Sequence, residues 1–233
     1  MLMIAHRAGT DRYPEQCMDA VNFSLSNGAD LAEVDARFTL DKDTPVICHD
    51  ENVARVFGVD SNVSDLTLDE FLALRQVENP EIGTYTFKQL LENTTGRILL
   101  HVKIKPEEFA PILRVIHECK AEERVVLGVQ ETECVDFIKK DDPRIQILSF
   151  MYNLGYLDAF LDTSCEYIRL WEPWTTQERI DKVHAAGKKV WIMSGTFDTV
   201  GYTEWSNLKK WQSMGADGVL INEILKAKAY MEE

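Results

Sequence analysis

The sequence predicts an α/β protein folded as a (β/α)8 TIM barrel, and two observations support this. Eight short apolar runs recur along the 233 residues, with helix-like stretches between them. Apolar strands that alternate with amphipathic helices are typical of a parallel sheet covered by helices. No internal repeat and no linker rich in proline, glycine or serine divides the chain, so we expect a single domain over residues 1–233.

Each expected strand is a near-continuous apolar run. In chain order the runs cover 2–6, 30–36, 98–104, 124–130, 145–150, 166–171, 189–195 and 218–222. The first helix is expected over 14–27, and Gly28 follows as its C-terminal cap. Capping-box spacings predict three further helix starts, at Thr67/Glu70, Thr86/Gln89 and Thr175/Glu178.

The region after the second strand does not fit the simple alternation. The gap between Asp35 and the apolar run at Val46 is too short for a crossover helix. Turn-forming residues over 40–45 predict a short hairpin instead, which would return His49 to the level of Asp35. The segment from about 51 to 92, with two short capped helices, is then a small insertion before the third barrel strand.

Composition limits the partners of the protein. A formal charge of −14 weighs against a broad nucleic-acid or anionic-membrane surface, so a few local cations must hold any phosphate-bearing ligand. The five cysteines are widely spaced and predict reduced core residues. No secretory pattern and no apolar run of membrane-spanning length is present, which predicts a cytoplasmic protein without membrane insertion.

Polar side chains gather at the predicted C-terminal ends of successive strands, where barrel enzymes carry their active sites. These residues are His6, Arg7, Glu33, Asp35, His49, Asp50, His101 and Lys103. Glu33 and Asp35 are two residues apart and so point to the same side of a strand. Two buried carboxylates need a cation, which either a hard divalent metal or a salt-bridge network with Arg7 and Lys103 would supply.

These groups together are suited to splitting a phosphodiester. A metal and the fixed cations balance the charge of the phosphoryl group. One histidine takes a proton from the attacking oxygen, and the other protonates the leaving alkoxide. His6 and Arg7 by themselves would fit a strand end that simply meets water. Their combination with the other rim residues favours catalysis.

The chain resembles the glycerophosphodiester phosphodiesterase family, whose barrel is of the phospholipase C-like type. The motifs that carry the resemblance are His6-Arg7, Pro14-Glu15, Gly28-Ala29-Asp30, Glu33-Val34-Asp35 and His49-Asp50. It continues through Arg55, 64–74, 84–92, Lys103, Val190-Trp191 and 215–222, and so spans nearly the whole chain.

The resemblance implies metal-dependent hydrolysis of a small-molecule glycerophosphodiester to glycerol phosphate and an alcohol. By that resemblance, His6 and His49 are the acid and base. Arg7 and Lys103 bind the substrate, with Glu15 as a supporting carboxylate. Glu33 and Asp35 are the metal ligands. The implied cofactor is a divalent ion, Mg²⁺ or Ca²⁺.

Three departures from the family pattern bear on the chemistry. His101 stands where the family usually has a third acidic metal ligand, and an imidazole there tilts the preference toward Mn²⁺ or Zn²⁺. His101 would otherwise hydrogen-bond the substrate or a carboxylate. Ala8 replaces a glycine, and the 190–195 and 220–223 segments depart from the family on the far side of the rim.

Several alternatives remain at this stage. The same site would also suit a lysophospholipid, a sugar-phosphate diester or a glycerol-phosphate polymer. A degenerate barrel that binds a phosphorylated ligand without turnover is the non-enzymatic alternative. Trp171 and Trp174 follow the sixth strand, where rim placement and core packing are equally expected. The sequence leaves the alcohol and the oligomeric state open.

Overall fold

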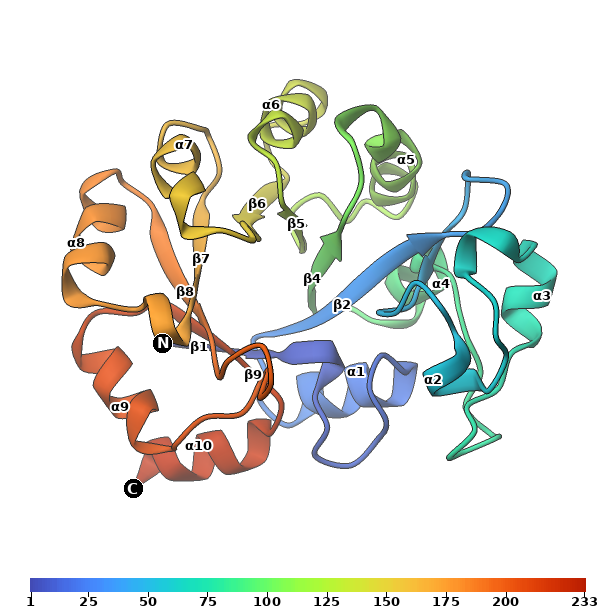
Figure 1. Ribbon diagram of the computed structural model, residues 1–233, viewed down its shortest axis with the longest axis horizontal. Helices are drawn as coiled ribbons and strands as arrows, with labels where there is room; N and C mark the ends of the chain where they lie inside the picture. Colours follow the sequence, from blue (N-terminus) through green and yellow to red (C-terminus); the bar gives the residue numbers. More distant parts are fainter.

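A computed structural model describes residues 1–233 as a closed barrel of parallel strands with helices on the outside (Figure 1). The eight barrel strands are β1 (Leu2–Ala5), β2 (Leu31–Phe38), β4 (Arg97–Val102), β5 (Val125–Val129), β6 (Gln146–Ser149), β7 (Tyr167–Trp171), β8 (Lys189–Met193) and β9 (Gly218–Ile221). Because β1 pairs with both β2 and β9, the sheet has no open edge within the ring. The predicted TIM barrel and its eight strands are confirmed.

The helices lie around the barrel (Figure 1). They are α1 (Met18–Ser26), α2 (Ala54–Phe57), α3 (Leu68–Ala73), α4 (Phe87–Asn93), α5 (Ala110–Glu118), α6 (Thr132–Asp141), α7 (Leu157–Leu161), α8 (Gln177–Ala185), α9 (Ser206–Ser213) and α10 (Ile224–Glu232). Short 3-10 turns occur at His6–Ala8, Val63–Asp65, Pro106–Phe109, Leu154–Tyr156 and Glu172–Trp174. None of the helices is both long and apolar enough to cross a membrane.

Two of the predicted helix starts are wrong. Helix α1 begins at Met18 rather than 14, because Gln16 has a φ of 61° and Cys17 Sγ caps the helix by accepting from Ala20 N–H at 3.3 Å. Helix α8 starts one residue later than predicted, because Thr176 rather than its neighbour is the N-cap. The other two capping boxes are confirmed, at the starts of α3 and α4.

The predicted hairpin after the second strand is confirmed. Strand β3 (Pro45–Ile47) is antiparallel to the outer part of β2, and Cys48 N–H donates to the Asp35 carbonyl at 3.0 Å. His49 therefore comes one residue past the level of Asp35. A separate apolar cluster joins the hairpin to the inserted helices, through Val46, Cys48, Val53, Val63, Phe71 and Leu74. This packing fixes the chain on which His49 stands.

Candidate active site

The pocket lies where the inward-facing side chains of the strands reach the C-terminal rim. In a strand every second side chain faces the barrel interior. The apolar interior includes Ile4, Leu31, Leu99, Tyr167 and Leu220. Two residues further along the same strands stand His6, Glu33, His101, Arg169 and Asn222. Along the inward-facing side of these strands the residues thus change from apolar to polar, and this change lies at the floor of the site.

A pocket of about 270 Å³ opens above this floor. Its lining includes seven of the residues singled out in the sequence, namely His6, Arg7, Glu33, Asp35, His49, His101 and Lys103. Glu15 lies behind Arg7, whose Nη1 donates to Glu15 Oε2 at 2.8 Å. The structure therefore brings the rim residues together and places Glu15 as a support for one of them.

Two buried carboxylates form one wall of the pocket. Glu33 is 1% exposed and Asp35 6% exposed, and neither forms an ion pair with a lysine or arginine. Glu33 accepts the backbone N–H of Arg7 at 2.7 Å, and Asp35 accepts Gln16 Nε2 at 2.8 Å. Burial, with the charge of Asp35 beside it, raises the pKa of Glu33. Burial acts to raise the pKa of Asp35 too, but the hydrogen bond from His101 and the electrostatic effect of the neighbouring histidines together outweigh it and hold that pKa low.

The salt-bridge network that the sequence left open does not form. The Arg7 guanidinium donates to Glu15 and His49 instead, and Lys103 is exposed. The carboxylates are left with a negative charge that no side chain neutralises.

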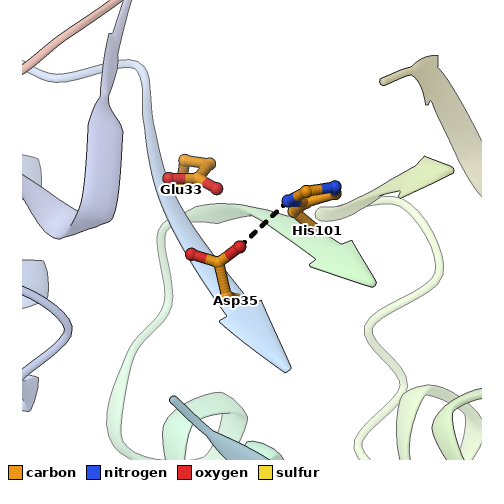
Figure 2. A group of neighbouring side chains, drawn as sticks. All are labelled: Glu33, Asp35 and His101. Carbon is orange, nitrogen blue, oxygen red and sulfur yellow. Dashed lines mark hydrogen bonds and ion pairs between the residues drawn. The ribbon is translucent and has the colours of Figure 1, made fainter. Parts of the chain in front are cut away.

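A cation would fit between these carboxylates. Ligand atoms of Glu33, Asp35 and His101 lie within 4.8 Å of one another, and the three side chains converge from β2 and β4 (Figure 2). Two carboxylate oxygens and an imidazole nitrogen suit a divalent metal, with the nitrogen favouring the softer members of that group.

The His101 ring is held in place on two sides. Its Nδ1 lies 2.9 Å from Asp35 Oδ1, in a hydrogen bond that a metal bound between the two atoms would replace, and the ring stacks on Phe150 with centroids 3.9 Å apart. Gly128 makes room for this stack, because a Cβ there would lie 2.7 Å from the Phe150 ring. Burial lowers the pKa of His101, so the ring is neutral, as a metal ligand must be.

His6 directly follows β1, and the side-chain amide of Asn222 holds its ring. Its Nδ1 lies 2.7 Å from Asn222 Oδ1, so that nitrogen is the donor and Nε2 keeps a free lone pair. Asn222 Nδ2 donates in turn to the Val200 carbonyl at 3.0 Å. Gly201, with a φ of 83°, lets Asn222 approach, because a Cβ there would lie 2.2 Å from its side chain. Burial lowers the pKa of His6 to about 4.

His49 sits in a closed ring of charged groups. Its Nδ1 bonds Asp50 Oδ1 at 2.7 Å, and its Nε2 accepts Arg7 Nη2 at 2.9 Å. Arg55 bridges the far side, donating to Asp50 Oδ2 at 2.6 Å and to Glu15. Burial opposes ionisation of Asp50 and Glu15, yet the bonds from Arg55 and its neighbours lower the pKa of both carboxyls. His49 thus has a carboxylate partner where His6 has an amide.

The backbone at Arg7 is strained. Arg7 and Ala8 have φ values of 50° and 71°, in the left-handed region that glycine adopts without cost. This turn aims the Arg7 N–H at Glu33 and the guanidinium at His49. The replacement of the family's glycine by Ala8 therefore falls on a residue that needs a positive φ.

Sequence reasoning missed two residues of the site. Asn222 and Arg169 both lie in the inward phase of their strands, and that period of two was the available signal. Trp171, which the sequence left between rim and core, lines the pocket, and Trp174 packs partly buried against the core.

A closed parallel barrel with titratable side chains at the carboxyl ends of its strands has the architecture of a TIM-barrel enzyme. Residues 6–154, more than half of the chain, match the "Glycerophosphoryl diester phosphodiesterase family". The chain belongs to this family, and so to the hydrolases that cleave phosphoric diesters.

Relatives with established names agree with this assignment. The chain is 27% identical over 171 residues to the glycerophosphodiester phosphodiesterase of Caldanaerobacter subterraneus, a match that covers 68% of this chain and 70% of the relative. It is 28% identical over 159 residues to a lysophospholipase D of Rattus norvegicus, covering 62% of this chain and 50% of the relative.

Solved structures share the fold. An Oleispira antarctica phosphodiesterase, solved in complex with the product sn-glycerol-3-phosphate, has a TM-score of 0.86 at 18% identity, over 100% of this chain and 97% of that one. A putative glycerophosphodiester phosphodiesterase from Galdieria sulphuraria has a TM-score of 0.84 at 15% identity, over 100% and 98%.

Proposed function

We propose that this protein hydrolyses glycerophosphodiesters to glycerol phosphate and an alcohol, with a divalent metal and two histidines. The observation that carries the proposal is the buried pair Glu33 and Asp35, which no cationic side chain neutralises, in one pocket with His6 and His49. Glu33, Asp35 and His101 would hold the metal, which would polarise the phosphoryl oxygens. The glycerol phosphate held by the Oleispira relative supports the substrate class.

Each histidine carries out one of the two proton transfers. His6 Nε2 takes a proton from the attacking water as the new P–O bond forms. His49 Nε2 gives a proton to the leaving alkoxide as the old P–O bond breaks. In the free protein Arg7 donates to His49 Nε2, so before His49 can act as the acid a bound phosphate must draw the Arg7 guanidinium away and Nε2 must take up a proton from solvent. Lys103, on the same pocket, would hold a second phosphate oxygen.

The direct test is release of glycerol phosphate from a panel of glycerophosphodiesters with Mg²⁺, Ca²⁺, Mn²⁺ or Zn²⁺, before and after chelation. We expect turnover with metal and none after EDTA. Glu33→Gln is the matched variant, because it keeps the shape and removes the charge, and it should lose metal binding measured by calorimetry together with activity. Full activity after chelation would exclude the metal.

The metal preference tests His101 separately. If His101 is a ligand, His101→Glu should shift the preference toward Mg²⁺ and Ca²⁺, because it restores a hard, charged oxygen. An unchanged order of metals would leave His101 as the hydrogen-bond partner of Asp35.

A larger groove beside the pocket bears on the alternative substrates. It has a volume of about 620 Å³ and shares Asp35, His49, His101 and Lys103 with the pocket. The rat relative is named a lysophospholipase D, which would need room for an acyl chain. Most residues of this groove are polar or charged, which supports a polar alcohol over a lipid. A lysophospholipid in the panel separates the lipid substrate from the polar one.

The five free thiols also support a cytoplasmic location.

A further inference from the structure

Arg169 is a buried cation on the pocket wall. It lies on β7, is 2% exposed and lines the same pocket as the two histidines. Its Nη2 donates to the Met151 carbonyl, while its Nε is buried without a partner. Burial alone lowers the pKa of Arg169 to about 9, and no acidic neighbour acts against it. A buried guanidinium in this state lacks a counter-charge.

The place of Arg169 in the barrel gives the pocket two oppositely charged walls. Strand β7 is the fourth strand from β2 in either direction around the ring, so Arg169 stands across the barrel from Glu33 and Asp35. A ligand between the walls would meet the carboxylates, and any metal they hold, on one side. On the other side it would meet a positive charge.

Aromatic rings surround the guanidinium. Its Cζ lies 4.8 Å from the ring centre of Trp171, 5.1 Å from that of Phe150 and 5.6 Å from that of Trp174. A cage of aromatic rings with no cation of the protein inside it can bind a quaternary ammonium ligand. Here a cation of the chain itself fills it, so this side of the pocket suits an anion.

We propose that Arg169 is an anion-binding residue that holds an anionic oxygen of the substrate from the β7 side of the pocket. That the anion belongs to a substrate rests on the proposed function. The oxygen belongs either to the scissile phosphate or to a second acidic group of the substrate, such as a carboxylate on the alcohol. Both sources need the same chemistry, a charge-assisted hydrogen bond from the free N–H groups.

Binding of inorganic phosphate, measured by its effect on the melting temperature in EDTA, tests the site without turnover or metal. A ligand that binds only the folded state raises the melting temperature. Arg169→Met should weaken phosphate binding about 10- to 100-fold, the range for a lost hydrogen bond to a charged group. Arg114→Met, an exposed arginine on α5, makes the same change in net charge and should bind phosphate as the native protein does.

Equal phosphate binding by the native protein and Arg169→Met would overturn the proposal. If that variant does not fold, Arg169→Lys takes its place, since it keeps the charge but loses the fork of donors, and unchanged binding by it would be the contrary result.

Kinetics then identify the anion. Glycerophosphoserine, glycerophosphoglycerol and glycerophosphocholine differ in the charge of the alcohol. An equal loss of kcat/KM on all three in Arg169→Met assigns Arg169 to the scissile phosphate, and a loss on the serine compound alone assigns it to the second acidic group. Unchanged kcat/KM on all three refutes a substrate contact. If the native protein turns over none of them while phosphate binding still depends on Arg169, the proposed function fails and the anion site stands.

Discussion

His6 and His49 reach one pocket from opposite kinds of surroundings. His6 is 7% exposed, and an amide, Asn222, accepts from its Nδ1. The His49 side chain is 27% exposed, and a carboxylate, Asp50, bonds its Nδ1. Burial lowers the pKa of His6 to about 4 and keeps its ring neutral, whereas His49 is more exposed and has a carboxylate beside it. We propose that this difference in surroundings makes His6 the base and His49 the acid.

The largest expected effect comes from removing either ring. His6→Ala and His49→Ala should each keep the fold, checked by circular dichroism, and lower turnover by roughly 100-fold or more, as expected for acid–base groups.

The leaving group separates the two variants. A 4-nitrophenyl phosphodiester needs no proton on its leaving oxygen, so His49→Ala should recover most of its loss on that substrate. His6→Ala should recover little, because the attacking water still needs a base. The reverse pattern would exchange the two roles.

A smaller effect is expected from Arg55, which closes the ring of charges behind His49. Arg55 touches Asp50 and Glu15 but does not line the pocket, so it is a positioning residue. Arg55→Met should lower kcat about tenfold, in the range for a weakened charged hydrogen bond, with little change in KM.

The leaving group also shows whether Arg55 affects His49 or only the stability of the fold. The loss should shrink on the 4-nitrophenyl substrate if Arg55 acts through His49 and His49 is the proton donor, as proposed. Arg114→Met is again the control. An equal loss on both substrates would mean that Arg55 acts on the fold and not on His49.

Much of this molecule followed from the sequence. The barrel and the hairpin were predictable because eight apolar runs and one short gap leave few topologies. The start of α1 was not, because Pro14 marks a helix entry while the positive φ of Gln16 keeps the chain in a loop to Cys17. Tertiary contacts impose that φ: Gln16 Nε2 donates to Asp35, and the Gln16 carbonyl accepts from Tyr85.

The sequence predicted which residues form the site better than it predicted the contacts between them. Sequence motifs identified the residues at β1, β2 and the hairpin. Asn222 and Arg169 belong to no motif, and could be found only by noting that every second residue of a strand faces inward and that these two come next after the inward apolar residues of their strands. No sequence pattern gives the choice of Arg7 between the carboxylates and His49, because that choice depends on the left-handed turn at Arg7.

The pH dependence of kcat/KM in the native protein and Asn222→Asp, at saturating metal, tests the division of roles most directly. If His6 is the base it must be neutral, so activity should fall as the pH drops through its pKa, which burial lowers to about 4. A carboxylate at 222 would raise that pKa, and the acidic limb should move toward neutral pH by roughly one to two units. An acidic limb at the same pH in both proteins would contradict His6 as the base.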